Sequence, residues 1–257
     1  MDSLRVVLVS HGASSIVLVL LALATRASFP DQTQFLWGVT AGVAGGVALM
    51  SFYTALSLGH MGSSAALSGL LAAALPVVVA LRTEGFPGWL RMGGFLLAAV
   101  AIWLIAGSSG AEGAKGDRRA MALALVAGAG FGVFLVAIKY AGNGGVVWAL
   151  ISSRVGSLGT TLLAMLWVGF RPGPARPGFT GRGLQWALIA STLDTSGNLL
   201  YIVATRVGRL DVAAVLGSLY PASTMLLAAW MLHERPTRRQ ALGMGAALVS
   251  VVAITAN

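Results

Sequence analysis

The stretch that decides the fold runs from Ala213 to Gly243 and reads AAVLGSLYPASTMLLAAWMLHERPTRRQALG. It opens with an apolar segment of about 20 residues, which is long enough for a helix to cross the hydrocarbon core of a membrane. Pro221 lies within this segment and has no N–H to donate, so a carbonyl one turn earlier loses its helical partner. In lipid, that carbonyl needs another donor, or the helix breaks where it lines a cavity. A membrane-spanning helix is therefore predicted, with either a tolerated kink or a functional break at Pro221.

The composition of the whole chain agrees with a membrane protein. Hydrophobic residues make up 57% of the 257 residues and charged residues 10%, whereas about 25% of residues are charged in typical soluble domains. The net charge of +9 does not indicate nucleic-acid binding, because the basic residues lie mostly in short gaps between apolar runs, as in loops that face lipid headgroups. With no cysteine, the chain can form no disulfide and no thiolate site.

About nine apolar segments of membrane-spanning length alternate with short polar loops. They cover residues 6–25, 35–56, 63–81, 90–106, 120–138, 147–168, 184–205, 212–232 and 240–256. The predicted fold class is therefore all-α and integral to the membrane. The second segment carries Gly38, Gly42 and Gly46 at four-residue spacing, which leaves one helix face without side chains and predicts close packing against a neighbour.

An internal repeat relates the two halves of the chain. A shift of about 150 residues places Glu84 on Glu234 and Gly93 on Gly243, within the same order of helix, short basic turn and helix. A polar, Gly-rich segment separates the two halves. The sequence therefore predicts a first repeat over residues 1–107, a linker over 108–119 and a second repeat over 120–257.

Two motifs in the quoted stretch carry a family resemblance. The pattern small-small-x-L-x-x-L-x-P at 213–221, followed by E-R-P-x-x-x-Q-x-x-G at 234–243, resembles the second repeat of the EamA transporters in the drug/metabolite transporter superfamily. The resemblance implies ten helices in two inverted five-helix repeats, of which this chain supplies four plus five. The first helix of the family fold is therefore expected to be missing, through a start site placed too far downstream or a truncated gene. The reading frame upstream of Met1 is expected to encode that helix.

Two arguments about orientation in the membrane disagree. The loops on the side that holds Arg118 and Arg239 carry more basic residues than the opposite loops, which predicts a cytoplasmic position for that side and for the amino end. The family resemblance instead implies that a nine-helix chain has its amino end outside and its carboxyl end inside. Both orientations stay open.

Asp194 is the only acidic residue deep within a predicted helix. It shares one helix face with Ser191, Asn198 and Tyr201, because these positions recur every three or four residues. A charge at the bilayer centre costs about 2.5–3.5 kcal/mol on insertion scales, so it usually faces a partner or a water-filled cavity. Asp194 is therefore predicted either to line a substrate site or to anchor neighbouring helices through hydrogen bonds.

Arg154 is a second charged residue inside a predicted helix, about two turns from its start. It can meet a substrate carboxylate, pair with Asp194 or extend its charge to the nearer interface. In the first repeat, Ser10 and His11 occupy the place of Ser153 and Arg154. The predicted substrate-binding residues are Asp194, Asn198, Tyr201, Ser191, Arg154, Tyr220 and Pro221.

The remaining titratable residues predict no metal or cofactor site. The other acidic residues, Glu84 and Asp211 among them, lie at predicted helix ends or in loops, where a charge costs little. His11, His60 and His233 are widely separated and show no metal-ligand spacing. The sequence therefore predicts that no cofactor is bound.

The pattern favours a secondary carrier over an enzyme or a channel. A membrane enzyme would need reactive side chains clustered near an interface, and a channel would need polar rings or a filter loop; the sequence has neither. It also has no nucleotide-binding loop, so a gradient is expected to drive transport, with protons as the candidate coupling ion. The resemblance implies that the substrates are small metabolites such as amino acids, or amphipathic drugs. The protein is expected to be a monomer or homodimer in the cell (inner) membrane. The alternative is a truncated or transport-inactive membrane subunit.

Overall fold

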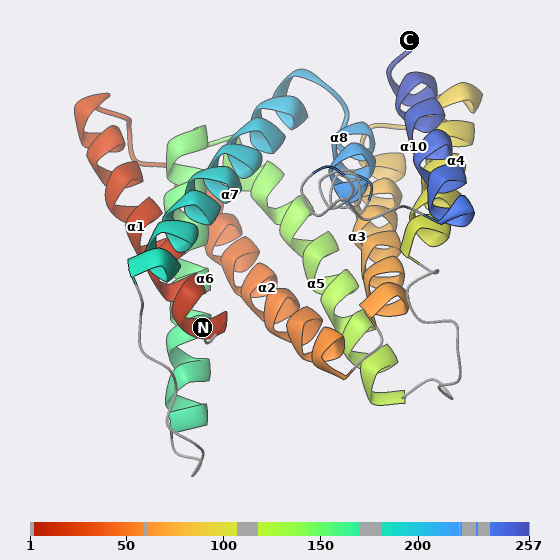
Figure 1. Cartoon of the computed structure of the whole chain (residues 1–257). Helices are drawn as coiled ribbons and strands as arrows, with labels where there is room; N and C mark the ends of the chain where they lie inside the picture. Colours follow the sequence, from red (N-terminus) through yellow and green to blue (C-terminus); the bar gives the residue numbers. More distant parts are fainter. Residues whose placement is uncertain are drawn as a thin grey trace. The chain divides into compact units, whose positions relative to one another are not determined.

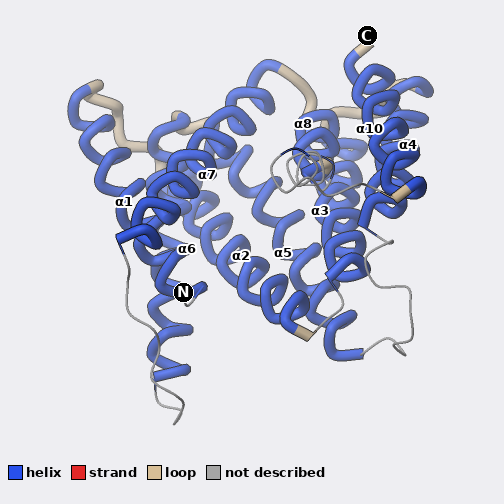
Figure 2. The backbone as a smooth tube through the Cα atoms, viewed as in Figure 1, coloured by secondary structure: helices blue, strands red, loops and turns tan. Residues whose placement is uncertain are grey.

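The computed structural model of the chain describes residues 3–58, 61–106, 118–169, 181–220, 222, 230 and 237–256. These residues form helices α1 (Ser3–Ala24), α2 (Gln32–Ser57), α3 (Met61–Thr83), α4 (Trp89–Ala106), α5 (Arg118–Gly142), α6 (Val146–Gly169), α7 (Gly181–Val207), α8 (Leu210–Ser218) and α10 (Arg238–Thr255) (Figure 1). Figure 2 shows helices and connecting loops, with no strand, over the residues described. The prediction of an all-α fold is confirmed.

Length and hydropathy mark this fold as one for a membrane. Within the described ranges, six helices are long and apolar enough to cross a bilayer, namely α1, α2, α3, α5, α6 and α7, and α4 contains a shorter apolar helix. Their bounds differ from the predicted segments by only a few residues. The protein is therefore a multi-pass membrane protein.

The two prolines within predicted helices have different outcomes. Pro76 is fully buried within α3, which continues through it from Met61 to Thr83. The helix predicted over 212–232 begins as α8, but Pro221 lies outside the described residues. Whether the chain kinks or breaks at Pro221 therefore stays a prediction.

Helix starts recur at a nearly constant spacing in the two halves of the sequence. Gln32, Met61 and Trp89 begin α2, α3 and α4, and Gly181, Leu210 and Arg238 begin α7, α8 and α10, each 149 residues later. Ser3 and Val146 begin α1 and α6, which are 143 residues apart. The inverted topology and the repeat boundaries stay predictions.

The chain divides into two compact units, each drawn from both halves of the sequence. Unit 1 comprises residues 1–47 and 136–207, and unit 2 comprises residues 48–135 and 208–257. Within unit 1, α1 packs against α6 and α7; within unit 2, α3 packs against α8, and α4 against α10. The pairs α1 with α6, α3 with α8 and α4 with α10 join helices at corresponding places in the predicted repeats.

In unit 1, a glycine seam holds α2 against α6, with Gly38, Gly42 and Gly46 on α2 and Gly156 on α6. A Cβ atom at Gly42 would overlap the carbonyl oxygen of Ser153, and one at Gly156 would overlap the carbonyl oxygen of Val39. The two backbones therefore touch directly, as the four-residue glycine spacing predicted.

The close contact at the glycine seam can be tested by adding a methyl group to it. Gly42→Ala should destabilise the protein by about 1–3 kcal/mol, because the added methyl group meets backbone that cannot move aside without separating the helices. Gly159→Ala is the matched control, since a Cβ there meets no atom within 4 Å, and the better helix propensity of alanine adds up to about 1 kcal/mol. Thermal unfolding in detergent measures both variants; equal melting temperatures would contradict the seam.

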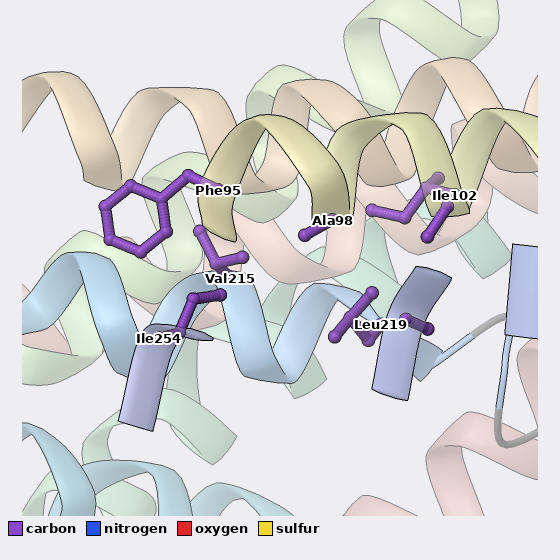
Figure 3. Packing of buried hydrophobic residues seen from close by; sticks show 8 residues of the cluster. Phe95, Ala98, Ile102, Val215, Leu219 and Ile254 are labelled. Carbon is purple, nitrogen blue, oxygen red and sulfur yellow. The ribbon is translucent and has the colours of Figure 1, made fainter. Parts of the chain in front are cut away.

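The apolar core of unit 2 lies between α4, α8 and α10. Phe95, Ala98 and Ile102 of α4 point toward Val215 and Leu219, with Ile254 of α10 beside them (Figure 3). Small residues allow α4 and α10 to approach closely, since a Cβ at Gly94 would lie 2.7 Å from the Ile254 side chain. Helix α10 starts with a capping box in which the Thr237 side chain and Gln240 satisfy each other's backbone N–H groups.

A second feature of unit 2 is the Arg209 clamp, an ion pair that ties the start of α8 to the turn after α3. The Arg209 guanidinium donates to both Asp211 carboxylate oxygens, at 3.0 and 2.8 Å, and to the backbone carbonyls of Glu84 and Gly85. The Glu84 carboxylate in turn accepts from the N–H of Leu210, at 3.0 Å. The hydrogen bond with Asp211 raises the pKa of Arg209 above its ordinary value. The prediction that Asp211 lies where charge costs little is wrong, because its side chain is fully buried.

Candidate functional site

A polar cluster lies within unit 1, where α1 packs against α6 and α7. Arg154 on α6 donates from a terminal guanidinium nitrogen to Asp194 Oδ2 on α7 at 2.6 Å. The same nitrogen lies 3.2 Å from Thr195 Oγ1. Of the three roles open to Arg154 from the sequence, the structure shows the pairing with Asp194. The residue is only 4% exposed, so its guanidinium lies among groups of the protein.

The two partners of this ion pair differ in burial. The Arg154 side chain is 5% exposed and the Asp194 side chain 46%. Arg154 Nε is buried and has no hydrogen-bond partner among the residues that the structure describes. A guanidinium has five donors, so the cluster contains a buried donor that remains available for an acceptor.

The other predicted residues on α7 divide into two kinds. Asn198 donates to Asp194 Oδ1 at 3.2 Å and so belongs to the cluster. Ser191 is buried and donates to the backbone carbonyl of Ser10 at 2.6 Å, which ties α7 to α1. Tyr201 is half-buried on α7. The structure thus brings Asn198 into contact with Asp194, whereas the Ser191 hydroxyl joins two helices.

The two remaining predicted site residues lie elsewhere in the chain. Tyr220 belongs to unit 2, where its side chain hydrogen-bonds with Ser68 and is 38% exposed. Pro221 lies outside the described residues. Whether Tyr220 and Pro221 belong to the substrate site therefore stays a prediction.

His11 is the residue that sequence reasoning missed. Its Nδ1 lies 2.8 Å from Ser157 Oγ on α6, and its Nε2 lies 3.8 Å from Asp194 Oδ2 on α7. The repeat carried the signal, because His11 and Arg154 are separated by the same 143 residues as the starts of α1 and α6. Metal-ligand spacing does not identify this histidine, whereas its counterpart in the repeat, Arg154, is a predicted site residue.

The cluster suits charged or hydrogen-bonding organic ligands better than metals. Within the ranges described, no group of three or more histidine, aspartate or glutamate residues could hold a metal ion. The arginine offers donors, while the carboxylate offers acceptors on the half-exposed side. These groups can bind a small molecule that carries both an anionic and a cationic group.

The protein is a multi-pass membrane protein, and two of its membrane-spanning helices, α6 and α7, are joined by the ion pair between Arg154 and Asp194. It therefore has a polar site within its helical region. The model of the EamA-like transporter family matches residues 118–256. The chain therefore belongs to the EamA-like transporter family.

A comparison with solved structures shows the same fold. One structure, described only as "Crystal structure of protein", superposes with a TM-score of 0.72 at 17% sequence identity, over 99% of this chain and 89% of that chain. At this identity the similarity concerns the fold alone. No curated protein matches the chain.

Proposed function

We propose that the protein is a secondary carrier that moves small metabolites or amphipathic compounds across the cell (inner) membrane by alternating access. Membership of a family of membrane transporters supports a transport role. The single observation that carries the proposal is the ion pair between Arg154 and Asp194, buried on one side and half-exposed on the other. Charges inside membrane-spanning helices are costly and usually mark a substrate or ion pathway.

The groups around this pair favour a small zwitterion, such as an amino acid, as the substrate. A substrate ammonium group can donate to the half-exposed Asp194 carboxylate, beside Asn198. A substrate carboxylate can accept from Arg154 Nε, the buried donor without a partner among the described residues. An amphipathic organic cation would use the Asp194 part of the site alone.

Protons are the proposed coupling ion. Asp194 can exchange its pairing with Arg154 for a proton or for a bound substrate cation, so its charge state can depend on which ligand is present. A carrier needs such a group to link substrate movement to a proton gradient. With no nucleotide-binding loop in the sequence, the gradient would be the energy source.

The experiment that tests this function is uptake into proteoliposomes at several imposed pH gradients, using radiolabelled amino acids and a labelled amphipathic cation. Asp194→Asn should stay folded, because the amide oxygen still accepts from Arg154, but transport should lose its response to the gradient. Asn198→Ala should weaken substrate binding and retain that response, because Asp194 is unchanged.

Two outcomes would contradict the proposal. If Asp194→Asn transport follows the gradient as the parent protein does, Asp194 is a packing anchor between α6 and α7. If the parent protein moves none of the labelled compounds in either direction, the chain is better explained as a transport-inactive membrane subunit.

A further inference from the structure

The His11 imidazole on α1 has no part in the transport cycle proposed above, yet it contacts two polar partners on two other helices. Nδ1 lies 2.8 Å from Ser157 Oγ, and Nε2 lies 3.8 Å from Asp194 Oδ2. The imidazole is 15% exposed, so both contacts form in a mostly desolvated environment. Hydrogen bonding there is strong when complete and costly when incomplete.

The hydrogen bonds of Ser157 determine which nitrogen of His11 carries the proton. The Ser157 hydroxyl donates its single hydrogen to the backbone carbonyl of Arg154 at 3.2 Å. With that hydrogen placed on the carbonyl, we assign the oxygen as the acceptor of a hydrogen bond from Nδ1–H of His11. Assigned from this network, neutral His11 is protonated on Nδ1 and keeps a lone pair on Nε2.

Two hydrogen-bond acceptors consequently face each other without a donor between them. His11 Nε2 lies 3.8 Å from Asp194 Oδ2, and Arg154 donates to the same carboxylate oxygen at 2.6 Å. Helices α6 and α7 pack against α1, and Arg154 and Asp194 are the charged groups that they direct at His11 among the residues described. One additional N–H donor would satisfy both His11 Nε2 and Asp194 Oδ2.

We propose that His11 Nε2 and Asp194 Oδ2 form a shared position that holds either one proton or the primary ammonium group of a substrate. A proton on Nε2 makes the imidazolium a donor to the carboxylate. An ammonium nitrogen lying beside the pair reaches both acceptors at hydrogen-bond distance. As the ammonium group binds, one proton leaves Nε2 for water. The site therefore has the same charge when it holds the proton as when it holds the ammonium group, and the proton and the ammonium group exclude each other.

This inference rests on the proposed transport function and deepens it in two ways. The substrate class becomes compounds with a primary ammonium group, because a quaternary ammonium has no N–H to place between the acceptors. Substrate and proton are then exchanged across the membrane, because each change between the two conformations of the carrier moves either the proton or the ammonium group.

The first test reads the proton position directly and needs no transport. The full chain, labelled with ¹⁵N-histidine in lipid nanodiscs, contains three histidines, and His11→Asn identifies the His11 signals. We expect neutral His11 to show the Nδ1–H tautomer, and Ser157→Ala to abolish that preference. A dominant Nε2–H tautomer in the parent protein would overturn the inference.

The second test measures binding of butylammonium and butyltrimethylammonium by calorimetry over a series of pH values. Below the pH at which His11 becomes half protonated, butylammonium affinity should fall about tenfold for each pH unit, because one proton must leave. Butyltrimethylammonium should bind about tenfold more weakly above that pH, because it lacks N–H donors.

Variants on α1 provide the controls for this binding. His11→Asn should make butylammonium affinity independent of pH, since its amide can donate to Ser157 Oγ but offers nothing at the position of Nε2. Ser15→Ala, one turn further along α1, should behave as the parent protein, because the Ser15 hydroxyl donates to the backbone carbonyl of His11 and not to its imidazole. Equal affinity for the two cations, or an unchanged pH dependence in His11→Asn, would overturn the inference.

Failure of this inference can be told apart from failure of the proposed function. Transport combined with an Nε2–H tautomer would remove the shared position and leave the carrier function standing. Competition between protons and butylammonium without any transport would leave the shared position standing and remove the carrier function.

Discussion

Arg209→Met should lower the free energy of unfolding by about 3–5 kcal/mol, because it leaves the Asp211 carboxylate buried without its cationic partner. The variant also loses the hydrogen bonds from Arg209 to the carbonyls of Glu84 and Gly85, which join α8 to the turn after α3. Thermal unfolding in detergent should register a decrease of roughly 6–20 °C for a chain of this size. The raised pKa of Arg209 keeps the guanidinium charged at every pH suited to this measurement.

Two further variants test whether the ion pair causes this loss. Arg206→Met removes an exposed arginine at the end of α7 and should change stability by no more than about 0.5 kcal/mol. Combining Arg209→Met with Asp211→Asn should recover part of the stability, because the buried group is then uncharged. A double variant as unstable as Arg209→Met alone would assign the loss to the carbonyl contacts.

The second large effect is expected at Asp194. Asp194→Leu should destabilise the protein by about 3–5 kcal/mol, because Arg154, at 5% exposure, would lose its anionic partner inside unit 1. Arg154→Leu should cost less, because the carboxylate that it leaves is 46% exposed in the structure and is therefore less buried than the guanidinium. The order of the two melting temperatures is the result to measure.

The conservative variant separates charge from shape at this position. Asp194→Asn should melt between the parent protein and Asp194→Leu, because the amide oxygen still accepts the hydrogen bond from Arg154 but carries no charge to pair with the guanidinium. If Asp194→Leu melts no lower than Arg154→Leu, burial of the arginine does not determine the stability of the cluster.

Most of the fold could be predicted from the sequence, because a bilayer imposes both a length and an apolar composition on each helix. The start of α10 illustrates this, since residue 240 was predicted and Arg238 is observed, after a capping box at Thr237. The glycine spacing of α2 predicted close packing against another helix, but a periodic pattern does not identify that helix. Its identity as α6 came only from the structure.

The candidate site was predicted in part for the same reason. Helical periodicity placed Asp194 and Asn198 on one face of α7, and their hydrogen bond agrees with that placement. Pairing with Arg154 was one of three alternatives, because periodicity orients a side chain without naming its partner on another helix. His11 is isolated in the sequence, so no local pattern marks it as a site residue. The place of Asp211 near a helix end does not reveal that it is buried in an ion pair with Arg209.

The glycine seam between α2 and α6 restricts how the site in unit 1 can move. With bare backbone on both sides, sliding one helix along the other would move Gly42 away from Ser153 and Gly156 away from Val39, and residues that carry side chains would take their places. We therefore expect little shear at this contact, so that the two helices move together and carry Arg154 with them. A rearrangement that opens the ion pair must take place where side chains separate the helices, with α1 or α7 swinging away from α6.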